Sequence, residues 1–294
     1  MSPQPRSHQV GFAEILLREQ GIYRLRIAAA EDLLDEGARF VDETGRAPLS
    51  GAKLLLAVQA TRATHIFESV IALCRIGRGV PASMLNRALL EEALDVHWVA
   101  AHPEEAPALA DDHEKLVRLG ERALDERFGR PTQPLTADER AALRKLRGRY
   151  NDFKAPWTLA TDAERIDLIK NRWGVEAGRD VDFVYEVIQR QNNALLHPSP
   201  MGYGLAMSPG RRQINRVGPD QRWRDALGHG VLGYYLICRV LAEEFGFDKD
   251  RAAQIFNHLG CLNKVFSDEH LASLPADALC PCESGRLVTE CHAL

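Results

Sequence analysis

Apolar residues recur at helical spacing along nearly the whole chain, and this pattern constrains the fold more than any other feature of the sequence. Val, Ile and Thr do not gather into alternating runs, whereas Ala, Leu, Arg and Glu dominate. Apolar residues spaced three to four positions apart mark one face of a helix, and strict alternation marks a strand. The sequence therefore predicts an all-α, multi-helix bundle. The expected helices span residues 11–44, 51–77, 82–101, 104–128, 137–153, 161–172, 181–197, 221–246 and 249–266.

Three patterns predict details of these helices: the burial of one helix, the N-caps of two, and the apolar stripe of another. The helix at 82–101 is apolar on two sides, which is typical of a central, buried helix. Asp162 and Asp180 are the expected N-caps of the sixth and seventh helices, since Asp is among the residues that satisfy free backbone N–H groups. Arg62 falls on the apolar stripe of the helix at 51–77. That stripe consists of Leu55, Val58, Ile66, Val70 and Leu73.

Composition excludes several classes of protein. The 294 residues are 45% apolar, which argues against disorder, and a net charge of −4 argues against a globally basic nucleic-acid binder. The apolar stretch at 231–238 is far shorter than the roughly 20 residues of a membrane span, and residues 1–10 lack the apolar core of a signal peptide. We expect a cytoplasmic protein with no membrane partner. One helical domain would cover residues 1–268, and a separate segment would follow at 279–294.

The cysteines divide into two groups. Cys74, Cys238 and Cys261 lie singly in apolar helical contexts and are expected to be buried thiols. The other three cluster at the C-terminus with one histidine. This group consists of Cys280, Cys282, Cys291 and His292.

Three thiolates and one imidazole within thirteen residues form a complete tetrahedral donor set for Zn²⁺. Gly285 lets the chain turn back between the two ligand pairs. Four protein ligands make a closed, structural zinc site rather than a catalytic one. The alternative is an unstructured tail in which the cysteines occur by chance.

This segment resembles the SEC-C motif, a zinc knuckle at the C-terminus of the bacterial preprotein-translocation ATPase. The positions at the family spacing are Cys280, Pro281, Cys282, Ser284, Gly285, Cys291 and His292. Glu283 replaces the usual glycine, and residues 287–289 replace most of the usual basic and aromatic stretch. Because the family's knuckle contacts macromolecules, the resemblance implies docking onto a protein or ribonucleoprotein partner.

A second, weaker constellation lies in the helical part. Arg87 and Glu91 are four residues apart and share one face of the central helix. They form either an ion pair inside the core or a site where Glu91 holds the arginine for an anionic ligand. On the latter interpretation the protein is a small-ligand sensor.

A later helix carries Glu186, Arg190, Asn193 and His197 on one face. It is followed by a Gly/Pro-rich segment, residues 198–220, which contains several arginines. Arginines stabilise charge on phosphate oxygens, and an imidazole transfers protons near neutral pH. The alternative is a structural helix end with a satisfied histidine.

Two resemblances converge on this region. Residues 50–245 resemble an uncharacterised bacterial helical domain family, through Arg87-x-x-x-Glu91 and a helix that ends in His197-Pro-Ser. The Arg190-x6-His197 spacing resembles HEPN proteins, all-helical domains that often act as metal-independent endoribonucleases in bacterial defence and toxin systems. The HEPN resemblance implies that Arg190 neutralises the scissile phosphate, that His197 transfers a proton and that Asn193 holds the substrate, with RNA as partner and two sites paired in a homodimer.

Two other features have simpler interpretations. The basic run of Arg144, Lys145, Arg147 and Arg149 is expected to be a solvated helix face rather than an RNA-binding stripe, because acidic residues flank it. The spacing of His97, His102 and His113 places them on no shared face, so they are not expected to form a metal site.

Overall fold

The computed structural model describes residues 12–46, 48–129, 133–196 and 223–265, together with Pro275 and Ala278. All regular structure in these ranges is α-helical, as predicted. The helices are α1 (Phe12–Thr44), α2 (Gly51–Arg75), α3 (Gly79–Ala101), α4 (Ala106–Arg127), α5 (Ala137–Arg149), α6 (Asp162–Trp173), α7 (Val175–Leu196), α9 (Trp223–Phe245) and α10 (Lys249–Val265). Most bounds agree with the expected ranges to within a few residues, but α7 begins well before residue 181.

The predicted caps of α6 and α7 are wrong. Thr161 caps α6, because its hydroxyl accepts from the backbone N–H of Glu164 while the Glu164 carboxylate accepts from the N–H of Thr161. Asp162 is instead the first residue of the helix. Gly174, with φ of 97°, ends α6, and α7 starts immediately afterwards, so Asp180 lies inside α7.

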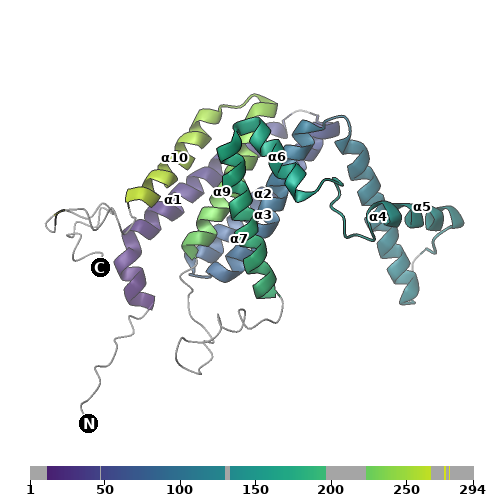
Figure 1. Ribbon diagram of the computed structural model, residues 1–294, viewed down its shortest axis with the longest axis horizontal. Coiled ribbons are helices and arrows are strands. Elements are labelled where there is room, and N and C mark those ends of the chain that lie inside the picture. The colour runs from purple at the N-terminus through teal and green to yellow at the C-terminus, as the bar shows by residue number, and fades with distance from the viewer. Residues whose placement is uncertain are drawn as a thin grey trace, which may run out of the picture.

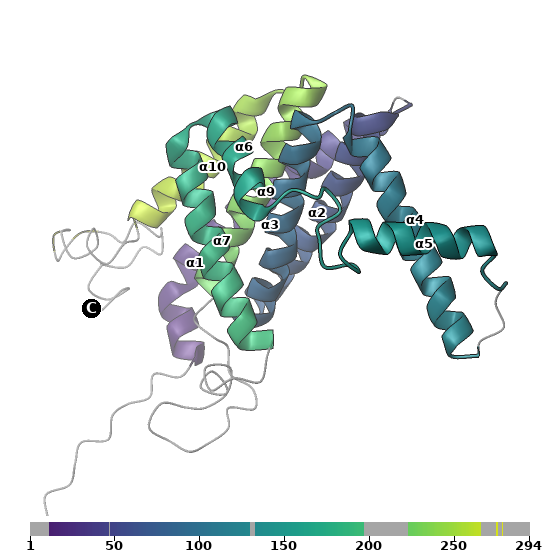
Figure 2. The same cartoon turned by 45° about the vertical axis from the view of Figure 1, so that its right-hand side comes forward.

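The long helices run up and down in an antiparallel bundle (Figures 1 and 2). Helix α3 is the central element: it packs against α2 and α9 on one side and against α6 and α7 on the other. Helix α1 covers α2 and α9 and is itself packed against α10. The predicted central position of the helix at 82–101 is confirmed, since residues such as Leu89, Ala93 and Leu94 are fully buried.

Small residues on α9 allow α3 to approach closely. A Cβ atom built on Gly233 would lie 3.3 Å from Cγ of Leu89, and one on Gly230 would lie 2.9 Å from Oδ1 of Asn86. Asn86 is completely buried and donates from Nδ2 to the carbonyl of Ala226 at 2.6 Å. The α3–α9 contact therefore combines tight packing with a buried hydrogen bond.

Tyr234 joins three helices in the core. Its hydroxyl on α9 lies 2.8 Å from Oγ1 of Thr64 on α2, and its ring stacks on Phe67 with centroids 4.6 Å apart. On the α1 side, a Cβ atom at Gly37 would lie only 2.2 Å from the tyrosine Oη. Gly37 is thus required for α1 to pass over the ring.

Helices α4 and α5 form a separate arm, defined here as residues 106–150, which projects from the bundle (Figures 1 and 2). The arm has its own small apolar core. It consists of Leu116, Leu119, Leu135, Leu143, Leu146 and Tyr150. The Tyr150 hydroxyl donates to the Leu109 carbonyl at 3.1 Å, which fixes the end of α5 against the start of α4.

No helix in the described ranges has the length and apolar character needed to cross a membrane.

Candidate functional site

A buried polar cluster lies between α3 and α6. The guanidinium of Arg165 is almost completely buried and donates to Asp95 at 2.6 Å, to Glu91 at 3.0 Å and to Asp162 at 2.5 Å. One cation therefore serves three carboxylates. Because an unpaired charge is costly to bury, these contacts fix α6 onto the centre of α3.

Two aromatic donors complete this cluster. The Tyr185 hydroxyl on α7 lies 2.8 Å from both Glu91 and Asp162, and the indole N–H of Trp157 donates to Asp95 at 2.7 Å. Burial, together with the neighbouring charge of Glu91, raises the pKa of Tyr185, so its hydroxyl stays a donor. Burial also raises the pKa of Asp95, an effect that the charge of Arg165 opposes.

These contacts show whether the predicted ion pair between Arg87 and Glu91 forms. Both carboxylate oxygens of Glu91 are engaged, one by Arg165 and one by Tyr185. Within the described residues no ion pair joins Glu91 to Arg87, which is half-buried on the same helix. The expected pair is not formed, because the buried Arg165 needs the carboxylate of Glu91 as a counter-ion.

Two of the catalytic residues expected from the sequence, Arg190 and Asn193, belong to the C-terminal part of α7. Helix α7 runs antiparallel to α3, and Tyr185 contacts Glu91 (Figure 2). At about 1.5 Å of rise per residue, Arg190 lies about 7.5 Å beyond Tyr185 and Arg87 about 6 Å beyond Glu91 in the same direction. The backbone of Arg190 is thus at about the level of Arg87.

The side chains of Arg190 and Asn193 lie outside the described residues, as does His197. The four predicted zinc ligands, Cys280, Cys282, Cys291 and His292, also lie outside them. Within the described part of the chain, no group of three or more His, Cys, Asp or Glu side chains is arranged to hold a metal ion.

The buried positions of Cys74 and Cys238 agree with the sequence prediction, whereas the side chain of Cys261 lies outside the described residues. Cys74 and Cys238 are fully buried thiols, and burial raises the pKa of the Cys238 thiol. His97 is buried against the edge of Trp173, and burial lowers its pKa to about 4, so the imidazole is neutral at pH 7. His102 stacks on Trp98, and His113 contacts Tyr150 in the arm.

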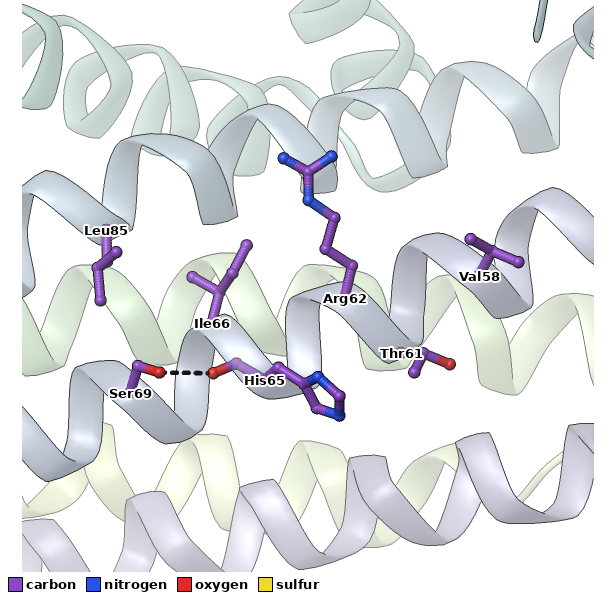
Figure 3. A pocket seen from close by; sticks show the side chains of 7 residues that line it. All are labelled: Val58, Thr61, Arg62, His65, Ile66, Ser69 and Leu85. Atoms are coloured by element: carbon purple, nitrogen blue, oxygen red, sulfur yellow. Dashed lines mark hydrogen bonds between the residues drawn. The ribbon is translucent and has the colours of Figure 1, made fainter. Parts of the chain in front are cut away.

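An open groove lies between α2 and α3, with a volume of about 560 Å³ (Figure 3). Its lining residues are Val58, Thr61, Arg62, His65, Ile66, Ser69 and Leu85. The side chain of Arg62 extends toward α3 in Figure 3 and pairs with Glu92 at 2.9 Å. Glu92 is only 6% exposed, and burial raises its pKa to about 7.

The face of α2 that packs into the core differs from the predicted one. Val58 is 57% exposed, whereas the face packed into the core contains Leu56, Ala60 and Phe67. Sequence reasoning did not identify the groove. The sequence did contain one signal for it: Arg62 is a charged residue on an apolar stripe, and such a residue marks the boundary of the buried face.

No protein-family model, curated protein or solved structure matches this chain.

Proposed function

We propose that this protein is a zinc-binding docking protein, in which a C-terminal knuckle on a helical scaffold binds a protein or ribonucleoprotein partner in the cytoplasm. The observation that carries this proposal is the donor set Cys280, Cys282, Cys291 and His292, which is complete within thirteen residues. Its chemistry fits Zn²⁺, since thiolate and imidazole are the ligands of closed structural sites.

The helical scaffold supports this assignment indirectly. Cys74 and Cys238 are enclosed by the core, so they do not compete with the terminal cysteines for metal. A segment as short as residues 279–294 cannot bury an apolar core of its own, so metal binding would supply its folding free energy. The bound ion would shape a surface for the partner.

Metal analysis of the purified chain tests the zinc site. We expect about one equivalent of zinc per chain, lost in Cys282→Ser and retained in Cys74→Ala, which removes a buried thiol instead. Cross-linked partners in the native cells should likewise be lost with Cys282→Ser and kept with Cys74→Ala. Absence of zinc from the wild-type chain, or retention of zinc by Cys282→Ser, would contradict the proposal.

A second candidate function is metal-independent cleavage of RNA. It is supported by the antiparallel packing of α3 and α7, through which two helices contribute Arg87 and Arg190 at about the same level. In this candidate Arg190 neutralises the scissile phosphate, Asn193 holds the substrate, and His197 moves a proton during attack by the 2′-hydroxyl.

The nuclease candidate is tested with RNA in the presence of a chelator. We expect cleavage by the wild-type chain, no cleavage by His197→Ala, and full cleavage by His258→Ala, which removes an exposed imidazole on α10. Equal cleavage by the wild type and His197→Ala would exclude His197 from the reaction.

A further inference from the structure

One helix of the α4–α5 arm, α5, carries a concentration of positive charge. Helix α5 has five basic residues and two acidic ones within its thirteen residues, in a chain with a net charge of −4. The arm has a separate core and stands away from the bundle (Figures 1 and 2). Its surface is therefore accessible to a large ligand.

The positive charge lines a groove between the two helices of the arm, with a volume of about 450 Å³. Four arginines line it against one carboxylate, that of Glu126. The arginines are Arg127 of α4 and Arg140, Arg144 and Arg147 of α5. The three on α5 follow the spacing i, i+4 and i+7, so they form a row along the helix. Leu135 and Leu143 supply apolar surface within the groove.

Two of these cations have no acidic partner in the described part of the chain. Arg140 pairs with Glu126 at 3.3 Å and donates to the Leu135 carbonyl at 3.1 Å, and Arg147 lies 3.5 Å from Asp152. Arg127 and Arg144 are exposed, and no ion pair joins either of them to a described carboxylate. They are therefore available to bind an anion.

An exposed aromatic ring adjoins the groove. Phe128 follows α4 and is 69% exposed, and the guanidinium carbon of Arg127 lies 5.8 Å from its ring centroid. A basic groove beside exposed aromatic surface is the combination that binds single-stranded nucleic acids, since the cations contact phosphates and the ring stacks on a base.

We propose that the arm binds single-stranded nucleic acid, with Arg127 and Arg144 on the phosphodiester backbone and Phe128 against a base. Guanidinium groups match phosphate oxygens in a bidentate manner. An acidic peptide would satisfy the arginines but would make no use of the exposed ring. Binding at this groove requires neither the zinc ligands nor His197.

The test is fluorescence anisotropy of labelled twelve-nucleotide oligo(dT) and oligo(rU) with the full-length protein. Oligo(dT) has no 2′-hydroxyl, so its binding is measured without cleavage. We expect both to bind, with affinity that falls as salt rises. Binding of only one of the two would contradict recognition through phosphates.

Charge reversal provides the matched comparison. We expect Arg144→Glu to weaken binding at least tenfold and Phe128→Ala to weaken it about fivefold. Arg179→Glu, which reverses an exposed charge on α7, should change it less than twofold. Equal affinities for Arg144→Glu and Arg179→Glu would overturn the proposal. Circular dichroism melting of each variant verifies that it is folded.

Two further outcomes would also overturn it. Loss of oligonucleotide binding in Cys282→Ser would assign nucleic-acid binding to the C-terminal segment and contradict the proposal. Retention of that binding would show that the arm acts independently of the proposed docking function. The second outcome has two parts: a twelve-residue polyglutamate peptide competes with the same affinity as oligo(dT), and Phe128→Ala leaves oligo(dT) binding unchanged. That outcome would identify the arm as a site for acidic peptides.

Discussion

Arg165 of α6 donates to Asp95 of α3 over 2.6 Å inside the bundle, and the two residues are 70 positions apart in the sequence. The same guanidinium also pairs with Glu91 and Asp162, so a single cation joins the central helix to the first turn of α6. Tyr185 adds α7 to this contact. The cluster is thus the polar link between α3 and the α6–α7 pair.

Removal of this cation should destabilise the protein strongly. We expect Arg165→Met to lower the free energy of unfolding by about 3–5 kcal/mol at pH 7, because it leaves carboxylates without their counter-ion in a buried site. Urea unfolding measures the effect, with Arg179→Met on the exposed face of α7 as the control. A loss as small as that of the control would show that the cluster contributes little to stability.

Glu92 should make stability fall as pH rises. Its pKa is about 7 in the folded chain and 4.5 as the reference, so between these values the folded state holds a proton that the unfolded state has released. The wild type should therefore lose on the order of 2–3 kcal/mol relative to Glu92→Gln between pH 4.5 and 7. Urea unfolding across this range checks it, with Glu68→Gln as an exposed control. A constant difference between wild type and Glu92→Gln would contradict the prediction.

His97 should have the opposite effect. Its pKa is about 4 when folded and 6.5 as the reference, so the unfolded state binds the proton first as pH falls. Stability contributed by the neutral imidazole is complete above pH 6.5 and is lost toward pH 4, by on the order of 2–3 kcal/mol. The comparison of wild type with His97→Phe isolates this loss from that of Glu92, and His258→Asn serves as control. Parallel pH curves for wild type and His97→Phe would refute it.

Two glycine substitutions should act in opposite directions. Gly37→Ala places a Cβ atom 2.2 Å from the Tyr234 hydroxyl, so we expect it to lower the free energy of unfolding by about 1–3 kcal/mol. Gly228→Ala meets no atom within 4 Å and should raise it by up to about 1 kcal/mol, since alanine favours the helix. Thermal unfolding of both variants tests the pair. Similar changes in the free energy of unfolding of the two variants would show that the α1–α9 contact accommodates the added methyl group at little cost.

Prediction from sequence succeeded for the central helix, although the apolar stripe predicted on α2 did not match its buried face. The burial of Leu89 and Leu94 on the helix at 82–101 followed from apolar residues on two sides of one helix. The assignment of Glu91 to Arg87 was wrong, because the partner that binds Glu91 is 74 residues away on α6. The early start of α7 was also missed, since Gly174 ends one helix without separating it from the next.

Arg144, Lys145 and Arg149 of the basic run on α5 are exposed, as predicted, but the groove beside them was not predicted. The charges of this run were visible in the sequence, and their pattern indicated an ordinary solvated face. The arm brings Arg127 of α4 to the same groove as Arg144, with Phe128 beside it. The placement of α4 relative to α5 depends on the core around Tyr150. Residue spacing along the chain therefore does not predict which residues of the two helices share a groove.

The helical class of this protein follows from its residue pattern, and the sequence places three cysteines and a histidine within residues 280–292. Helix formation depends on residues close together along the chain, so local spacing is sufficient to predict it. Which charges meet depends on the packed helices: Arg165 pairs with Asp95, Arg62 pairs with Glu92, and Arg127 lines the same groove as Arg144. These relationships depend on how helices distant in sequence pack, and packing is governed by the shape of the whole core.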